Sequence, residues 1–255
     1  MADAPDPSPG ALVPRPGVGR VFEAARRVRL ADVSPAGRLR LDAATRYLQD
    51  VSADDTADAA LADAEAWVVR RTVIEVATFP RYLELLRLAT WCSGIGSHYA
   101  ERRISISGER GGAIEAATTW VHVDTGSGRP RRVPERFHDC YGDAAAGRRI
   151  KARLTLPDPP ADGAGVDRAP WPLRFTDVDV LDHVNNAAYW EAVEETLADH
   201  RDLRAPLRAE LEHRRAVERG DQVERWSRRE RDGALSVWLV VDGAPAAAAR
   251  VRPLR

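Results

Sequence analysis

The sequence predicts an α+β protein made of two similar units, each with one long helix packed against an antiparallel sheet. Two observations support this prediction. VRLADV at residues 28–33 resembles LRFTDV at residues 173–178, and an amphipathic run follows each segment, with Tyr47 and Tyr189 at matching points, 189 − 47 = 142 residues apart. Stretches of alternating polarity then follow each run, so the same order of elements occurs twice. We interpret this order as a duplicated supersecondary unit.

The helix of each unit is expected soon after its first strand. LDAATRYLQDV at residues 41–51 is the amphipathic run of the first unit, and residues 187–198 form the run of the second. In the second run, apolar residues recur at spacings of three and four, which is the period of an amphipathic helix. We therefore expect each helix to lie on the concave face of the strands that follow it.

The strands are predicted from apolar and polar residues that alternate with a period of two. GERGGA at residues 108–113 and Asp242-Gly243 lie between paired runs and are typical of hairpin turns. IEVATFPRYLEL, which starts at Ile74, can be laid on LEHRRAVERGDQ, which starts at Leu211, and this adds to the repeat. The alternating runs are residues 101–107, 118–124, 235–242 and 244–251.

Proline and glycine divide the chain further. Residues 1–20 are rich in proline and have no basic stretch followed by an apolar one, so we expect a disordered tail and no signal peptide. Residues 156–170, LPDPPADGAGVDRAP, have the composition of a linker. The expected domains are therefore residues 21–155 and residues 171–255.

Composition limits the classes of function. The chain has 255 residues, 30% charged residues and a net charge of −1, so no basic surplus indicates a nucleic-acid or membrane partner. No apolar run reaches the roughly 18–20 residues of a membrane span. The two cysteines, Cys92 and Cys140, form neither a disulfide framework nor a metal motif. We expect a cytoplasmic protein.

The stretch TDVDVLDHVNNAAYW, from Thr176 to Trp190, carries the candidate site. Asn185 stands where an N-cap would satisfy the first backbone N–H groups of the second helix. The positive end of that helix can then face an anion or a polarised carbonyl. Asp179 and His183 lie on the loop that leads to it, and such a pair can activate water.

This arrangement suits acyl transfer to water, because donors aimed at a developing oxyanion give a large catalytic effect. The alternative is that these residues only shape a turn and cap a helix, since acidic segments before helices are common. We assign Asp177 and Asp182 to that structural role. Three arginine pairs are candidates to meet an acidic carrier protein or a phosphate, with a solvated, salt-bridged face as the favoured alternative: Arg102/Arg103, Arg131/Arg132 and Arg214/Arg215.

DVDVLDHVNNAAYW resembles the D-x-D-x-x-x-H-V-N-N-x-x-Y segment of the acyl-ACP thioesterase family. The similarity continues through RVRLADV, WVVRRTVIEVATFPRYLE, TWCSGIGSHYAERRISI and WVHVDTGSGRPRRVPE, and covers about residues 21–255. It implies two tandem hotdog domains, each with a long helix wrapped by an antiparallel sheet. It also implies that only the second repeat is active, and this chain has Leu-Asp-Ala-Ala from Leu41 where the second repeat has HVNN.

Some residues of this chain match the active-site residues of the family, and others differ from them. Asp179 and His183 match the family's active-site Asp and His, and Asn185 completes the catalytic set that we expect. Asn186 and Tyr189 are candidates for substrate contact, with capping and packing as the alternatives. The plant enzymes have Asn where this chain has Leu181, and Glu-Cys where it has Ala216-Val217. Glu218 would share a strand face with Ala216, so it is a candidate to replace the missing Glu.

These observations lead to one function and two alternatives. We expect a thioesterase that hydrolyses fatty acyl-ACP to free fatty acid, without a metal or organic cofactor. The first alternative is hydrolysis of an acyl-CoA, as in the related hydroxybenzoyl-CoA thioesterases. The second is a catalytically silent acyl-binding protein, which the residues at positions 181, 216 and 217 favour. Because the duplication supplies an internal pseudo-dimer, we expect either a monomer or a homodimer.

Overall fold

The computed structural model describes residues 12–61, 66–124, 126–161, 163–180 and 182–254. Leu181, one of the residues that departs from the plant pattern, lies outside this part of the chain, as do residues 1–11 of the expected tail. Residues 12–20 are described, and they lie against the first repeat: Arg20 Nε donates to Asp55 Oδ1 (2.6 Å) and Arg15 Nη1 donates to Glu23 Oε1 (2.5 Å). The tail expected over residues 1–20 is thus too long, because these ion pairs hold its last residues in place.

The first half of the chain contains β1, a short 3-10 helix η1, α1, β2 to β5 and α2, and the second contains β6, η2, α3 and β7 to β10. Their bounds are β1 Val21–Arg27, η1 Leu30–Asp32, α1 Leu41–Asp58, β2 Ala66–Thr78, β3 Leu85–Ile95, β4 Tyr99–Gly108, β5 Ala113–Val123, α2 Glu135–Ala145, β6 Asp167–Pro170, η2 Phe175–Asp177, α3 Asn186–Ala198, β7 Leu207–His213, β8 Val223–Arg229, β9 Leu235–Val241 and β10 Ala244–Pro253. Apart from α2, each element of the first half has a counterpart in the second, in the same order. Both predicted hairpins are confirmed, because β4 pairs with β5 and β9 pairs with β10, each antiparallel.

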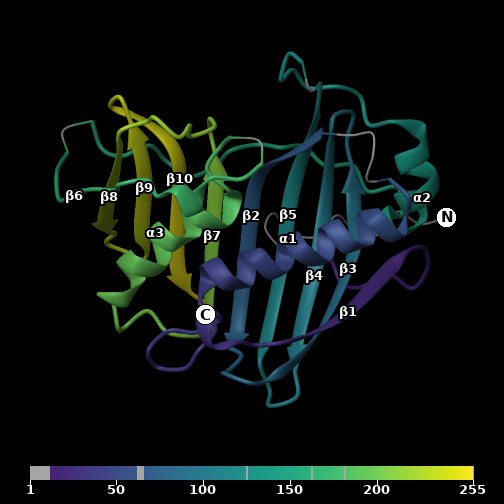
Figure 1. The fold of residues 1–255 in the computed structure, drawn as a ribbon, viewed down its shortest axis with the longest axis horizontal. Coiled ribbons are helices and arrows are strands. Elements are labelled where there is room, and N and C mark those ends of the chain that lie inside the picture. Colours follow the sequence, from purple (N-terminus) through teal and green to yellow (C-terminus); the bar gives the residue numbers. More distant parts are fainter. Residues whose placement is uncertain (1–11, 62–65, 125, 162, 181, 255) are drawn as a thin grey trace.

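All described strands join in one sheet of ten, in the order β1-β3-β4-β5-β2-β7-β10-β9-β8-β6. The order within the second half is the mirror image of the order within the first. β2 and β7 form the junction, where they pair antiparallel (Figure 1). At its centre Val73 lies opposite Glu210. The alignment that sets Ile74 over Leu211 makes Val73 and Glu210 equivalent, so the two repeats meet about a local twofold axis.

The long helices lie on the same face of this sheet, α1 across the strands of the first half and α3 across those of the second (Figure 1). Their apolar faces are buried in one core cluster that includes Tyr47, Trp190 and Val193. That core is continuous between the halves, and its burial supplies the main driving force for this arrangement. Helix α2 was not predicted; it packs against β3 at one end of the sheet, through Phe137 and Tyr141.

The turn that leads into each helix is built in the same way. Asp32 accepts a hydrogen bond from the Arg29 backbone N–H (2.9 Å), and Asp177 accepts one from the Arg174 backbone N–H (2.8 Å). Both aspartates are buried. Asp177 therefore has the capping role that we expected, and it fixes the path of the chain before α3.

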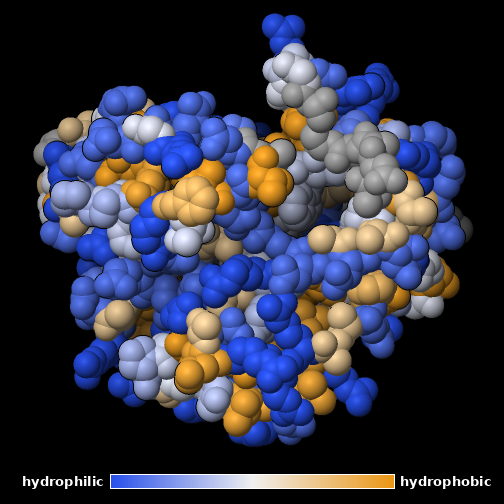
Figure 2. All heavy atoms as spheres, in the orientation of Figure 1, coloured by the Kyte–Doolittle hydropathy of each residue, from blue (hydrophilic) through white to orange (hydrophobic). Residues whose placement is uncertain are grey.

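No helix in the described ranges is long and apolar enough to cross a membrane. Polar and charged side chains cover most of the face that carries α1 and α3, with small apolar groups between them (Figure 2).

The start of α1 is closed by a side chain from α3. Glu194 is buried, with only 8% of its surface exposed. Its Oε2 accepts a hydrogen bond from the Leu41 backbone N–H (3.0 Å), and its Oε1 accepts one from Arg38 Nη2 (2.6 Å). A carboxylate at a helix N-terminus is stabilised by the first N–H groups and by the helix dipole. Glu194 therefore fixes the two helices relative to one another.

We expect Glu194→Gln to lower the free energy of unfolding by about 2 kcal/mol, because an amide cannot satisfy both a guanidinium and a helix start as a carboxylate does. Urea unfolding would measure this change. Glu195→Gln is the matched control, since Glu195 is the exposed neighbour on the same helix. Equal stability of the two variants would contradict the role of Glu194.

Candidate active site

The loop before α3 forms a tight turn that presents Asp179 and His183. The Asp179 backbone N–H donates to the His183 carbonyl (2.9 Å), and the Asp182 N–H donates to the Asp179 carbonyl (3.0 Å). Asp182 has a φ of 59°, a left-handed conformation that Asp and Asn tolerate better than most residues. Its side chain is exposed. Asp182 thus has the structural role expected of it, and the turn brings the backbones of Asp179 and His183 together.

Asn185 is the N-cap of α3, as predicted. Its Oδ1 accepts a hydrogen bond from the Ala187 backbone N–H (2.9 Å). Its Nδ2 donates to Asp179 Oδ2 at 3.4 Å, near the limit for a hydrogen bond. One side chain therefore satisfies the helix start and contacts the carboxylate, which places Asp179 beside the N-terminus of α3.

The first turn of α3 keeps a donor available. The N–H of Ala187 is capped by Asn185, and the N–H of Ala188 donates to the Asn185 carbonyl (2.9 Å). The N–H of Asn186 has no acceptor among the described residues. A helix start with a spare N–H attracts a developing negative charge. This donor lies next in the chain to Asn185, which contacts Asp179.

Asp179, His183 and the start of α3 open into one pocket of about 570 Å³. Both repeats form its walls: β2, β4 and β5 contribute from the first, and α3 and the end of β7 from the second. Among the predicted site residues, those that line it are Asp179, His183, Asn186 and Tyr189. The walls also include Trp67, Arg70, Tyr99, His213, Arg214, Arg215 and Ala216. The structure thus brings most of the predicted site together, at the boundary between the repeats.

Tyr189 and His213 form a rigid, uncharged part of the wall. Their rings meet edge to face, with centroids 4.6 Å apart, and Tyr189 Oη accepts a hydrogen bond from the Val217 backbone N–H (3.0 Å). Burial raises the pKa of Tyr189 to about 12. Burial, together with the positive charge of Arg70, lowers the pKa of His213 to about 3. Neither group is charged at neutral pH.

The segment after β7 places the residues that depart from the plant pattern. Ala216 lines the pocket, and Val217 is buried beside Tyr189. Glu218 pairs its backbone with that of His183 in an isolated β-bridge, but its side chain is exposed and is not part of the pocket wall. Among the described residues that line the pocket, Asp179 is the one carboxylate.

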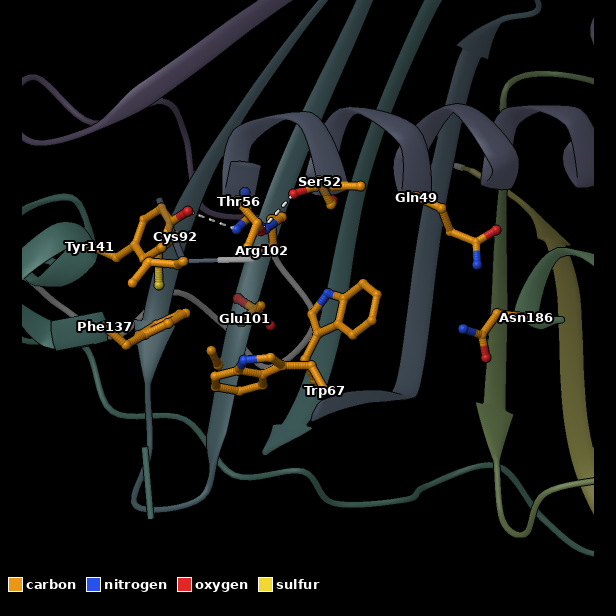
Figure 3. Close-up of a pocket in the computed structure, with 14 residues that line it drawn as sticks. Gln49, Ser52, Thr56, Trp67, Cys92, Glu101, Arg102, Phe137, Tyr141 and Asn186 are labelled. Carbon is orange, nitrogen blue, oxygen red and sulfur yellow. Dashed lines mark hydrogen bonds between the residues drawn. The ribbon is translucent and has the colours of Figure 1, made fainter. Parts of the chain in front are cut away.

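A second cavity, of about 390 Å³, adjoins the first and lies under α1. Trp67 and Asn186 line both spaces, so they mark the junction. Figure 3 shows Gln49, Ser52 and Thr56 along α1 on one side and Phe137 and Tyr141 of α2 at the far end. Cys92 also lines this cavity, and burial raises the pKa of its thiol to about 11, so it is not a thiolate nucleophile.

The sequence did not indicate several of the residues that line these two cavities. Trp67, Arg70 and His213 lie in strands and have no neighbouring partner in sequence that would indicate a site. Gln49 interrupts the apolar stripe of the first helix with a polar group, and this was a usable signal. Helical spacing places Gln49, Ser52 and Thr56 at i, i+3 and i+7, on one face.

Comparison with known families agrees with this geometry. Residues 19–141 match the acyl-ACP thioesterase N-terminal domain, and residues 165–250 match the acyl-ACP thioesterase C-terminal domain. An uncharacterised protein of Mycobacterium tuberculosis is 35% identical over 214 residues, which is 84% of this chain and 84% of that protein. Oleoyl-acyl carrier protein thioesterase 1 of Arabidopsis thaliana is 24% identical over 176 residues, and the match spans 46% of its length.

Solved structures share the fold. The 12:0-ACP thioesterase from Umbellularia californica superposes with a TM-score of 0.76 at 19% identity, covering 91% of this chain and 96% of that one. An acyl-ACP thioesterase from Bacteroides thetaiotaomicron has a TM-score of 0.72 at 16% identity, with the same coverage. The expected pair of hotdog units is thereby confirmed. With both family domains matched in order along its length, this chain belongs to the acyl-ACP thioesterase family of thioester hydrolases.

Proposed function

We propose that the pocket between the repeats hydrolyses fatty acyl-ACP, with Asp179, His183 and the start of α3 as its chemical groups. The observation that carries this proposal is that all three line one pocket, which adjoins a cavity in the first repeat at Trp67 and Asn186. A thioester carbonyl at the junction would face the helix start, while its acyl chain would extend under α1. Family membership supports the same reaction.

The reaction needs a nucleophile, an oxyanion site and a path for the leaving thiol. Asp179 removes a proton from water as the water oxygen attacks the thioester carbonyl carbon. The Asn186 N–H, the helix dipole and His183 stabilise the oxyanion, and each such donor contributes about 2.7–4 kcal/mol. Collapse breaks the C–S bond, and the proton held by Asp179 passes to the sulfur. The products are a fatty acid and the free carrier thiol.

Asp179 carries this role without a second carboxylate. Ala216 occupies the wall where the plant pattern has Glu, and the side chain of Glu218 is outside the pocket wall. Asn185 contacts Asp179 and caps α3. It therefore holds the general base at a fixed position relative to the oxyanion site at the start of α3. We propose Asn185 as a positioning residue.

The carrier thioester would enter past a group of arginines. Arg70, Arg214 and Arg215 line the pocket. Arg70 Nη1 donates to the His213 carbonyl (2.8 Å), and Arg70 has no carboxylate partner in the described part of the chain. A guanidinium with donors to spare suits a phosphate group. Both acyl-ACP and acyl-CoA carry a phosphate on their pantetheine arm, so kinetics on the two carriers must separate them.

We also propose how the chain is organised around this reaction. Residues 21–155 would form the substrate-pocket repeat and residues 171–255 the active-site repeat. Of the segment 156–170 between them, β6 at Asp167–Pro170 pairs with β8 and so belongs to the sheet of the second repeat. The chain would act as a monomer or homodimer in the cytoplasm and would supply fatty acids to lipid metabolism.

We expect Asp179→Asn to lower kcat on acyl-ACP by about 10²–10⁴-fold, because an amide cannot accept the proton from water. We expect His183→Ala to lower kcat by about 10²–10³-fold through loss of oxyanion stabilisation. The measurement is thiol release from acyl-ACP and acyl-CoA of several chain lengths.

Asp182→Asn is the matched control, because Asp182 lies on the same loop with its side chain outside the pocket wall, and Asn tolerates its φ of 59°. Asp182→Asn should keep wild-type turnover. Full turnover by Asp179→Asn would refute the site assignment, and absence of wild-type turnover on every substrate would refute the proposed reaction.

The lowered pKa of His213 predicts how the free energy of unfolding depends on pH. Its pKa falls from 6.5 to about 3 on folding, so the unfolded chain binds more protons between these values. The stability linked to His213 is therefore complete above pH 6.5 and is lost as the pH falls towards 3, by at most about 1.4 kcal/mol per pH unit. His213→Phe should lose less stability than wild type between pH 6.5 and pH 4.5 in urea unfolding.

The exposed His138 provides the control, since His138→Gln should follow the wild-type pH dependence. Parallel curves for wild type and His213→Phe would mean that His213 is protonated in the folded protein.

A further inference from the structure

We propose that the cavity under α1 is built for an acyl chain that carries a hydroxyl group close to its thioester end. This inference rests on the proposed function, because it assumes that the acyl chain of the substrate enters this cavity. It concerns the class of acyl group, which the reaction itself does not determine.

The cavity wall is more polar than a hydrocarbon chain requires. Gln49, Ser52 and Thr56 form a stripe along the face of α1 that lines it (Figure 3). A helix that packs on a sheet normally presents apolar residues at i, i+3 and i+7 on its inner face. Here that stripe is polar throughout, although Leu48 and Val51 on the same helix are buried in the core.

The hydrogen bonds that this stripe already makes determine which of its donors and acceptors remain available to a ligand. Ser52 Oγ donates to the Leu48 carbonyl (2.7 Å), and Thr56 Oγ1 donates to the Ser52 carbonyl (2.8 Å). Each hydroxyl therefore has its proton occupied and its lone pairs available. The Gln49 carboxamide has no hydrogen-bond partner within the described residues, so it keeps both its donors and its acceptor.

The far end of the cavity is polar but already satisfied. Tyr141 Oη donates to Asp55 Oδ2 (3.0 Å), and Arg102 Nη1 donates to the same oxygen. Arg102 Nη2 donates to Tyr141 Oη at 3.4 Å, and Arg20 reaches the other oxygen of Asp55 (2.6 Å). These groups stabilise one another. Trp120 Nε1 is a further unpaired donor of the cavity wall, since it is buried without a hydrogen-bond partner among the described residues. Unpaired groups that can both donate and accept lie at the other end, around Gln49.

Gln49 lies at the end next to the thioester site. Figure 3 shows its carboxamide pointing towards that of Asn186, which lines both the cavity and the active-site pocket. The Asn186 carboxamide also has no partner in the described ranges. A hydroxyl between the two amides could donate to one carbonyl and accept from the other N–H₂ group. A chain whose carbonyl lies at the start of α3 would pass this point with its first carbons.

The energetic consequence is a preference between substrates. A plain methylene chain would displace water from Gln49, which is half-buried, and leave its amide unpaired under the chain, which costs free energy. A 3-hydroxyacyl chain would replace the lost hydrogen bonds. One net hydrogen bond corresponds to about tenfold in kcat/KM.

The test compares decanoyl-ACP with 3-hydroxydecanoyl-ACP on the full-length protein. Wild type should hydrolyse the hydroxylated substrate with a kcat/KM about tenfold higher or more. Gln49→Leu should lower kcat/KM for the hydroxylated substrate and raise it for the plain one, which reverses the preference. A structural effect alone would lower both values by the same factor.

Asp54→Asn is the matched control, because Asp54 is exposed on the same helix, and it should keep the wild-type ratio. Ser52→Ala is a smaller change that replaces Gln49→Leu in the test if that variant does not fold. It should reduce the ratio of kcat/KM for the hydroxylated substrate to kcat/KM for the plain one. Equal or better hydrolysis of decanoyl-ACP by wild type, or an unchanged ratio in both variants, would overturn the inference while leaving the thioesterase function intact. Hydrolysis of neither substrate would overturn both.

Discussion

The antiparallel pairing of β2 with β7 is the constraint on which the rest of the molecule depends. It joins two half-sheets into one and sets Val73 opposite Glu210 at a local twofold axis. It also brings α1 and α3 side by side on one face of the sheet. The pocket forms at this boundary, with β2 on one side and the start of α3 on the other. Neither repeat alone contains all its walls.

Two repeats related by a local twofold axis could form two equivalent active sites, one at the start of each long helix. The side chains around these helix starts allow only one of them. At the start of α1, Glu194 of α3 fills the place that a substrate carbonyl would take. The residue of α1 that corresponds to Glu194 is Ser52, by the offset of the two tyrosines (194 − 142 = 52). Ser52 is short, and its hydroxyl bonds to its own helix. The start of α3 therefore stays open to the pocket, and in the proposed reaction the first repeat holds the acyl chain.

The sequence predicted the features that depend on local chemistry. The cap at Asn185, the turns before the helices, the hairpins and the repeat itself can all be read from neighbouring residues. The joining of the two half-sheets could not be predicted from neighbouring residues, because β2 and β7 pair across more than 130 residues (Ile74 with Ala209). From the sequence alone, either strand could have been an edge strand. His213, Arg70 and Trp67 join the site through this pairing, so nothing near them in sequence indicates it. The polar stripe from Gln49 was visible but gained meaning only with a cavity beside it.

We propose that one substrate spans both repeats, with its carbonyl at α3 and its acyl chain under α1. A crystal structure with an acyl-pantetheine ketone, in which a methylene group replaces the thioester sulfur, tests it most directly. We expect the carbonyl oxygen about 3 Å from the Asn186 backbone nitrogen. We also expect the alkyl chain to pass Trp67 and to lie along Gln49, Ser52 and Thr56. An alkyl chain placed between α3 and strands β7 to β10, or a carbonyl away from the start of α3, would contradict it.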